Sequence, residues 1–175
     1  MRRLEALATC APELRQAGDA RQVLTTAARH ARSLLPDADS LVAATRGGDM
    51  LGLNVVAADG VWAHGDRDTE RELRLALVRD VVRTGASIEI ERAGAAEAVE
   101  TVRIVPLLAE PPAAEPRRVL GAVAFSRLDS GPFSAADRLL LDEFAARVGL
   151  AMAQAELLSG GAAPAESAPT TRARA

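Results

Sequence analysis

The chain opens with two segments whose apolar residues recur at helical spacing. In the first, Leu4, Leu7, Ala11 and Leu14 fall three or four residues apart, which places them on one face of a helix. The second follows Asp19, whose carboxylate can accept a backbone N–H group at a helix start. Its apolar positions share one stripe: Val23, Leu24, Ala27, Ala28, Ala31, Leu34 and Leu35. Because Pro36 cannot continue a helix, the pattern predicts N-terminal helices within residues 2–35.

Residues 40–128 change to short apolar runs separated by turn residues. The runs at 40–45 and 51–57 flank the sequence Arg-Gly-Gly-Asp, which is typical of a hairpin between two antiparallel strands. The strongest runs lie at 102–108 and 119–128, joined by a proline-rich loop that cannot donate to a sheet. These four runs predict an antiparallel sheet.

A helix and a further strand are predicted between these strands. Residues 61–69 form a polar loop, after which apolar positions recur at helical spacing until Thr84. Gly85 then suits the left-handed backbone that closes a helix. Ile88 and Ile90 alternate with polar residues, which indicates a half-buried strand.

The last strand leads into a turn and a long helix predicted at 134–158. Ser134 can accept a backbone N–H group, and Asp137 favours the positive end of the helix dipole. Two apolar stripes run along this helix: one contains Phe144 and Val148, and the other consists of Leu139, Ala146, Leu150, Ala153 and Leu157. A helix that is apolar on two sides needs two surfaces to cover it, which are the sheet and either the N-terminal helices or another chain.

Size and composition favour one domain over residues 1–158. The chain has 175 residues, enough for a single hydrophobic core. Residues 159–175 contain no apolar residue larger than alanine or proline, so they cannot offset the entropy of ordering and are expected to be a disordered tail. Cys10 is the only cysteine, which excludes an intrachain disulfide.

The order of elements resembles that of a GAF domain, the small ligand-sensing module of bacterial signalling proteins. The resemblance covers nearly the whole of residues 4–158. Its anchors are the Arg-Thr-Gly-Ala turn after the middle helix, Val105-Pro106-Leu107, Leu120-Gly121, and Gly131-Pro-Phe-Ser before the last helix. It implies an α+β fold with a central antiparallel sheet. The terminal helices would pack on one face of this sheet, and a small-molecule pocket would lie on the other.

Particular activities of the family are not supported by the residues present. Cyclic-nucleotide-binding members carry an Asn-Lys pair, a Phe and an Asp-Glu pair, where this chain has Ser126-Arg127, Phe133 and Asp137-Arg138. Tetrapyrrole-attaching members use a cysteine in the sensory region, whereas Cys10 belongs to the N-terminal helix. The methionine sulfoxide reductases of the family need a second thiol to resolve a sulfenic acid. We therefore expect no covalent tetrapyrrole and no enzymatic activity.

Three residues are candidates for ligand binding, each with a structural alternative. Trp62 is expected to rim the pocket, either as a hydrophobic lid or as a stacking platform. His64 is the candidate axial ligand if the unknown cofactor is haem, but a solvated loop histidine is the favoured interpretation. Arg103 shares a strand face with Thr101 and Val105. If that face lines the pocket, Arg103 can bind a carboxylate, and if it faces solvent, it has no binding role.

Two functions remain open. The first is a non-catalytic regulatory domain that binds a small molecule and signals to a partner, or to a second copy of the chain, through its terminal helices. The second is an interaction or dimerisation module whose pocket is filled by side chains. The net charge of −3, with acids and arginines interleaved, argues against a nucleic-acid partner. No signal peptide or membrane-spanning run is visible, so we expect a cytoplasmic protein.

Overall fold

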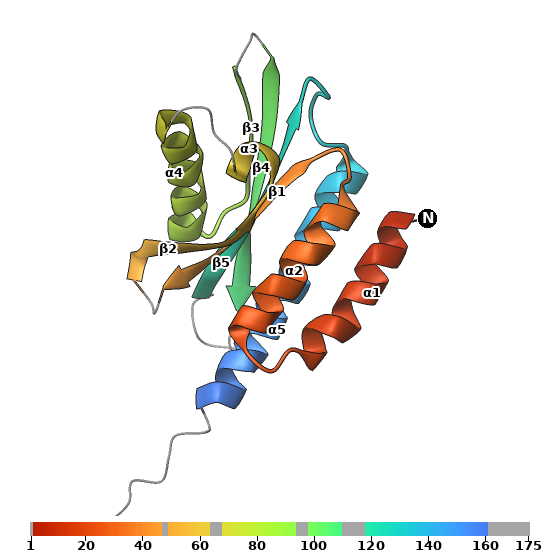
Figure 1. Ribbon diagram of the computed structural model, residues 1–175, viewed down its shortest axis with the longest axis vertical. Helices are drawn as coiled ribbons and strands as arrows, with labels where there is room; N and C mark the ends of the chain where they lie inside the picture. The colour runs from red at the N-terminus through yellow and green to blue at the C-terminus, as the bar shows by residue number, and fades with distance from the viewer. Residues whose placement is uncertain (1, 47–48, 64–67, 94–97, 110–117, 161–175) are drawn as a thin grey trace, which may run out of the picture.

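Three layers make up the part of the chain that the structure describes, with helices on both faces of one sheet (Figure 1). The structure is a computed structural model and describes residues 2–46, 49–63, 68–93, 98–109 and 118–160. The five strands are β1 (Asp39–Arg46), β2 (Asp49–Ala58), β3 (Ile88–Ala93), β4 (Val99–Ala109) and β5 (Arg118–Leu128). Their order in the sheet is β2-β1-β5-β4-β3, and every neighbouring pair is antiparallel. The predicted α+β class and antiparallel sheet are confirmed.

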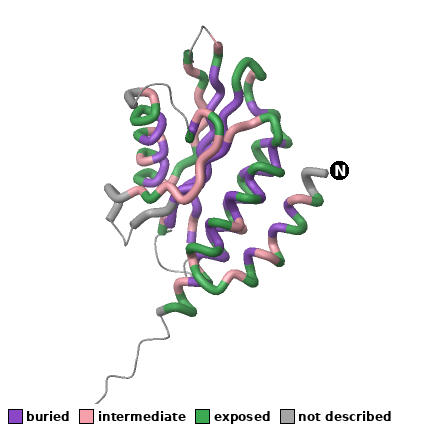
Figure 2. The backbone as a smooth tube through the Cα atoms, viewed as in Figure 1, coloured by how far each residue is buried: buried purple, intermediate pink, exposed green. Residues whose placement is uncertain are grey.

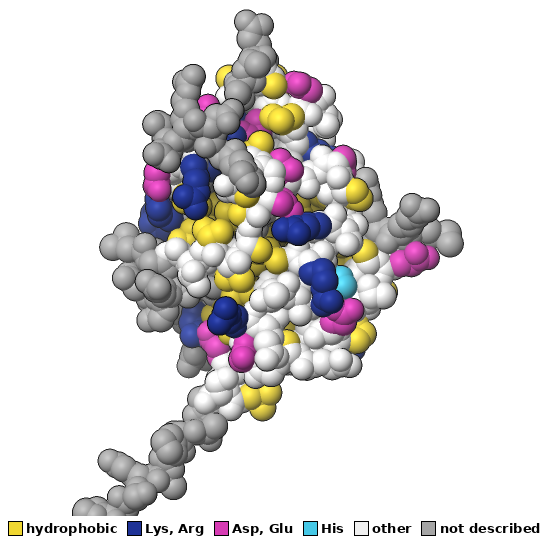
Figure 3. All heavy atoms as spheres, in the orientation of Figure 1, with side chains coloured by type: hydrophobic (Ala, Val, Ile, Leu, Met, Phe, Trp, Pro, Cys, Tyr) yellow, Lys and Arg dark blue, Asp and Glu magenta, His cyan; other side chains and the backbone are white. Residues whose placement is uncertain are grey.

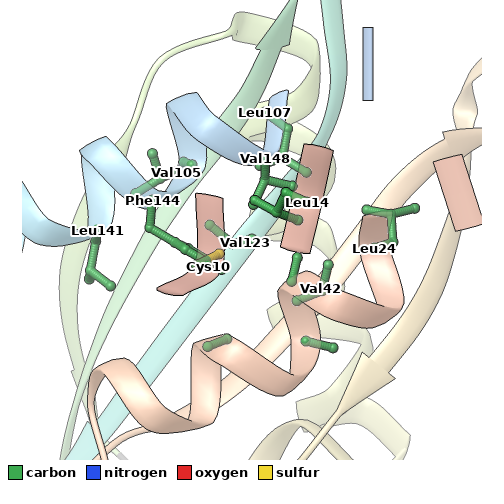
Figure 4. Packing of buried hydrophobic residues seen from close by; sticks show 14 of the residues in the cluster. Cys10, Leu14, Leu24, Val42, Val105, Leu107, Val123, Leu141, Phe144 and Val148 are labelled. Carbon is green, nitrogen blue, oxygen red and sulfur yellow. The ribbon is translucent and has the colours of Figure 1, made fainter. Parts of the chain in front are cut away.

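The terminal helices cover one face of the sheet, as predicted. They are α1 (Arg2–Gln16), α2 (Ala20–Leu34) and α5 (Ala135–Gly160), and they contact one another as well as the strands. The larger apolar core lies between these helices and the sheet and includes Leu107, Phe125 and Phe144. Figure 4 shows Cys10 of α1 among these core side chains. Burial raises the pKa of the Cys10 thiol to about 11, so this cysteine is a packing residue with little thiolate character.

The opposite face carries α3 (Gly60–Ala63) and α4 (Asp68–Thr84). A second, smaller apolar cluster lies beneath them and includes Leu41, Trp62, Val78 and Ile104. We call this side of the sheet the α3–α4 face, and the opposite side the α5 face. Figure 2 shows the buried positions concentrated in the middle strands and along the inner sides of the helices.

Alternation along the strands assigns each side chain to one of these faces. In β4, Val105 and Leu107 belong to the core under α5, whereas Val102 and Ile104 belong to the cluster under α4. The same alternation places Thr101 and Arg103 with Val105. The shared face that the sequence predicts for these three residues is therefore the α5 face.

The predicted helix boundaries are largely confirmed. The carboxylate of Asp19 accepts the N–H group of Gln22 at 2.8 Å at the start of α2, and Gly85 has a positive φ of 68° after α4. Helix α5 runs two residues past its predicted end, to Gly160, and the rest of the expected tail lies outside the described residues.

One local prediction was wrong. The segment expected to be a loop at 61–69 contains α3 and the beginning of α4. Long-range contacts stabilise α3, because Asp39 of β1 accepts the N–H group of Val61 at 2.9 Å. A Cβ atom on Gly60 would lie 1.9 Å from the Asp39 carboxyl carbon, so the side chain of Asp39 occupies the space that glycine leaves open. Local periodicity does not report such contacts.

Helix α5 approaches β4 most closely at Gly149. A Cβ atom at this position would lie 2.4 Å from the backbone oxygen of Leu108 and 2.8 Å from its nitrogen. Backbone atoms cannot rotate away as a side chain can, so the helix must be glycine here to keep its distance from the sheet. The contact lies where the register between β4 and β5 shifts.

We therefore predict that Gly149→Ala lowers the free energy of unfolding by about 1–3 kcal/mol, because overpacking outweighs the better helix propensity of alanine. Urea unfolding monitored by circular dichroism measures the change. Gly18→Ala is the matched control, since a Cβ atom there meets nothing closer than 3.6 Å. Equal stability of the Gly149 variant and the wild type would contradict the close approach.

Candidate functional site

A buried ion pair joins α4 to β4 on the α3–α4 face. Arg74 donates from Nε to Oε1 of Glu100 and from Nη2 to Oε2, both at 3.1 Å. Its Nη1 atom also donates to the backbone oxygen of Val61 at 3.2 Å, which ties α3 to the same pair. Glu100 is fully buried, at 0% exposure. Arg74 and Glu100 thereby form a bidentate ion pair that links the two elements.

Arg92 of β3 is a second cation at this carboxylate. Its Nε atom lies 3.4 Å from Oε2 of Glu100, and its side chain is 15% exposed. Two guanidinium groups therefore face one carboxylate. Removing charges from water costs several kcal/mol per ion, and a buried pair is weak evidence for a stabilising role.

Three buried polar atoms on this face find no hydrogen-bond partner among the described residues. They are Nε1 of Trp62, Nη1 of Arg92 and Oγ of Ser126. Trp62 and Ser126 are 3% and 2% exposed. A buried polar group without a partner costs about 1–3 kcal/mol, and native proteins contain few of them.

The strand register brings Arg92, Glu100 and Ser126 together on this face. Arg92 pairs with Glu100 across β3 and β4, and Val102, the next residue of β4 on this face, pairs with Ser126 of β5. Ser126 is therefore the diagonal neighbour of Glu100, about 7–8 Å away between Cα atoms. Trp62 follows Val61, which accepts the hydrogen bond from Arg74. We call Arg74, Glu100, Arg92, Trp62 and Ser126 the Glu100 cluster.

The three candidate binding residues of the sequence analysis do not lie together in the structure. Trp62 lies in the Glu100 cluster, and His64 lies outside the described residues. Arg103 points to the opposite, α5 face, where it donates from Nη1 to Glu89 at 3.3 Å and from Nη2 to Asp142 at 2.6 Å. Arg103 therefore lies on the other side of the sheet from Trp62, and its role in ligand binding stays a prediction.

Sequence reasoning missed Arg74, Arg92 and Glu100. Two signals were available. Arg92 continues the alternation of Ile88 and Ile90, so it shares their face, and Arg74 occupies a position that repeats with the buried Val78 and Val81 at helical spacing. A charged residue at an apolar position of a periodic pattern indicates a buried partner. The identity of that partner required the fold.

A second ionic network connects β3 to α5 on the α5 face. The Glu89 carboxylate accepts hydrogen bonds from Nε and Nη2 of Arg138 at 2.8 and 2.7 Å. It also accepts one from Arg103. Burial alone would raise the pKa of the Glu89 carboxyl, but the hydrogen bonds and charges of Arg138 and Arg103 hold the pKa below its ordinary value. Glu89 is therefore an anionic link between the edge strand and the C-terminal helix.

The start of α5 is held by a further ionic cluster. Ser134 and Asp137 form a reciprocal capping box, in which Ser134 Oγ accepts the N–H group of Asp137 and the Asp137 carboxylate accepts that of Ser134. Arg127 donates to Asp137 at 3.1 Å and lies 4.5 Å from the centre of the Phe133 ring. The cap that the sequence predicts at Ser134 is confirmed.

An open groove of about 430 Å³ lies between α1 and α2. Its lining includes Glu13 and Arg29, which form an ion pair whose side chains are 43% and 67% exposed. His30 of α2 also bonds to Glu13 from Nε2, at 3.0 Å, and this hydrogen bond is the main cause of a lowered pKa at the Glu13 carboxyl. These contacts pack α1 against α2, and the groove lacks the buried polar atoms of the Glu100 cluster.

The surface offers little support for large charged partners or metals. On the face drawn in Figure 3, acidic and basic side chains are intermixed. The described residues contain no group of three or more His, Cys, Asp or Glu side chains placed to hold a metal ion. Among the helices of the described segments, none is both long and apolar enough to cross a membrane.

Comparisons with known proteins identify the fold. No family model matches the chain, and no curated protein matches it. Among solved structures, it is similar to the GAF domain of a phosphoenolpyruvate-protein phosphotransferase from Coxiella burnetii, at a TM-score of 0.62 and 18% identity over 91% of this chain and 98% of that one. It is also similar to residues 122 to 287 of a methyl-accepting chemotaxis protein, at a TM-score of 0.59 and 13% identity over 87% and 99% of the two chains. These similarities confirm the GAF-like fold that the sequence predicts.

The cap of α5 gives a pH-dependent prediction. Burial raises the pKa of Asp137, but its hydrogen bonds from Ser134 and Arg127 and the Arg127 charge outweigh this and lower it. A lowered pKa in the folded state means that the stabilisation is present above the unfolded value, near pH 3.9, and is lost as pH falls through the folded value. We expect Asp137→Asn to lower the free energy of unfolding by about 1 kcal/mol at pH 7. The decrease should become progressively smaller as pH falls below about 4.

Urea unfolding at pH 7, 4 and 3 tests this expectation. Asp80→Asn is the control, because it removes the same charge from a solvent-facing pair with Arg83. A constant difference between the Asp137 variant and the wild type at all three pH values would contradict the role of the ionised cap.

Proposed function

We propose that this chain, which has the GAF fold, is a non-catalytic regulatory domain that binds a small molecule at the Glu100 cluster. Binding would alter the packing of α5 and so the association of the domain with a partner. The proposed location is the cytoplasm, where an unpaired thiol such as that of Cys10 remains reduced.

One observation carries the proposal: the unpaired polar atoms of the Glu100 cluster gather around an ion pair on one face of the sheet. A pocket filled only for structural reasons is expected to be apolar or fully hydrogen-bonded, because each unpaired group destabilises the fold. A ligand with complementary groups would remove this cost when it binds. The same atoms supply its hydrogen bonds.

Strand β3 offers a physical route from this site to the terminal helices. Arg92 faces the Glu100 cluster, while Glu89 of the same strand faces the opposite side and grips Arg138 of α5. As the last strand in the sheet order, β3 pairs with β4 alone. Suppose that β3 can lie in two positions and that a ligand binds more tightly to one of them. Binding would then favour that position, which would shift the Glu89–Arg138 contact and with it α5.

The output surface in this proposal is the exposed apolar stripe of α5. Leu139, Leu150 and Leu157 are 71%, 47% and 78% exposed, whereas Phe144 and Val148 on the other stripe are buried. Together with Ala146 and Ala153, the exposed leucines recur at alternating intervals of three and four residues from 146 to 157. This is the spacing of a coiled-coil seam, so we propose that a second copy of the chain packs here.

The comparisons support the regulatory part of the proposal. A methyl-accepting chemotaxis protein is among the proteins of similar fold, and another similar structure, at 14% identity and a TM-score of 0.55, contains bound biliverdin. These properties are those of the other proteins. The alternative for this chain is an interaction module without a ligand, and the apolar side chains packed under α3 and α4 favour it.

Trp62 allows ligand binding to be detected at the site itself. It is the only tryptophan, and the chain has no tyrosine, so intrinsic emission reports on the Glu100 cluster alone. We expect at least one compound in a metabolite screen to raise Tm and to change the emission of Trp62. A ligand at a hundred times its Kd would stabilise the fold by about 2.7 kcal/mol.

Trp62→Phe should lose the emission signal and show a weaker thermal shift, because it also removes the Nε1 donor. If no class of metabolite changes either quantity, the ligand-free interaction module replaces the sensor as the better account of the chain.

The exposed stripe gives a separate prediction. Sedimentation of the wild type should show a dimer, and Leu150→Glu should yield a folded monomer, because a charge in the seam would be buried without a partner. Leu73→Glu on α4 is the matched control, since Leu73 is also an exposed leucine, at 56%, but lies on the opposite side of the sheet. A dimer that survives Leu150→Glu would rule out this surface.

A further inference from the structure

The chemistry of the Glu100 cluster restricts the class of ligand, and this inference rests on the function proposed above. Two of the unpaired atoms, Nη1 of Arg92 and Nε1 of Trp62, carry hydrogen-bond donors and have no acceptor capacity. The third, Oγ of Ser126, can either donate or accept. The groups that would complete the hydrogen bonding of these atoms are therefore acceptors, which a bound ligand can supply.

The charges of the cluster favour an anion. Arg74 and Arg92 both face Glu100, and Arg74 already bonds to both oxygens of its carboxylate. One guanidinium charge is thus left without a counter-charge of its own at this carboxylate. The nearest other carboxylate on this face in the strand register is Asp39, paired with Ser126, and its Oδ2 atom accepts the N–H group of Val61. The Asp39 carboxylate is therefore already hydrogen-bonded at the start of α3.

The geometry also limits the size and the approach of the ligand. Leu41, Val78 and Ile104 belong to the buried apolar cluster beneath α4, so a ligand among them is expected to be small. Arg92 is the most exposed member of the charged trio, at 15% against 6% for Arg74 and 0% for Glu100. The ligand would therefore approach from the side of β3 and meet Arg92 first.

We propose that the Glu100 cluster binds a small oxyanion, such as a carboxylate or an inorganic oxyanion, whose oxygen atoms accept hydrogen bonds from Arg92 Nη1 and Trp62 Nε1. Arg92 supplies the charge and Trp62 supplies directional selectivity. Arg74 is a positioning residue, because it holds Glu100 and α3 in place. Glu100 orients Arg92 and keeps one of its nitrogen atoms available for the ligand.

The test compares acetate with acetamide, which have nearly the same shape but differ in charge, and adds phosphate as an inorganic oxyanion. Each is titrated into the full chain at constant ionic strength, with Tm and Trp62 emission as readouts. We expect saturable changes with acetate or phosphate and none with acetamide. Acetate alone would identify a carboxylate site, and phosphate alone an inorganic oxyanion site.

Two variants connect the response to the proposed contacts. Arg92→Gln should weaken binding by about tenfold or more, because it removes a charge-assisted hydrogen bond. Trp62→Phe should weaken the thermal shift severalfold without abolishing it. Arg79→Gln is the control, since Arg79 forms a solvent-facing pair with Glu72 at 3.4 Å and should leave the response unchanged. Circular dichroism confirms that each variant is folded.

The outcomes separate this inference from the proposed function. A response to neutral metabolites but to no oxyanion overturns the oxyanion class while the sensor function stands. A response to acetate or phosphate that is unchanged in both Arg92→Gln and Trp62→Phe overturns the assigned contacts. The absence of any response, to oxyanions and to all other metabolites, overturns both.

Discussion

The two-residue alternation of side chains along β3, β4 and β5 is the constraint on which the arrangement of this protein depends. It sends Val105 and Leu107 into the core under α5 and Val102 and Ile104 into the cluster under α4, so one set of strands supports both helical layers. The same rule separates the charged residues. Glu100 and Arg92 face α4, whereas Arg103 and Glu89 face α5, and each set forms its own ionic network. A shift of register by one residue would exchange the two networks and bury unpaired charges.

The two networks are built differently, and the difference bears on function. On the α5 face, Glu89 is paired with two arginines and links β3 firmly to α5. Unpartnered polar atoms occur on both faces, since Thr101 Oγ1 and Arg103 Nε lack partners within the described segments on the α5 face as Trp62 Nε1, Arg92 Nη1 and Ser126 Oγ do on the α3–α4 face. The networks differ in burial: Arg74 and Glu100 are 6% and 0% exposed, whereas Arg138 and Asp142 are 46% and 47% exposed. The first arrangement suits transmission of a displacement, and the second suits the reception of a ligand. Strand β3 contributes to both, which makes it the element through which the two sides would communicate.

The close contact between Gly149 and the backbone of Leu108 shows how α5 can pack tightly on the sheet and still present an apolar outer side. With a glycine at the point of closest approach, the helix lies directly on β4 and buries Phe144 and Val148 in the core. Its far side is then left with the exposed leucines at 139, 150 and 157. A helix held tightly on one side and apolar on the other is suited to carry a change in the sheet to a second chain.

Sequence alone determined the elements whose causes are local: the periodic helices, the capping residues Asp19 and Ser134, and the strands that alternate or run apolar. It also predicted that Thr101, Arg103 and Val105 share a face, since alternation follows from the geometry of any strand. Only the tertiary structure decided which helix covers that face, because no local pattern encodes the layer on which a strand packs. For the same reason α3 was missed, as it depends on Asp39 from a distant strand, and the partners of Arg74 and Arg92 became visible only when the fold placed both beside Glu100.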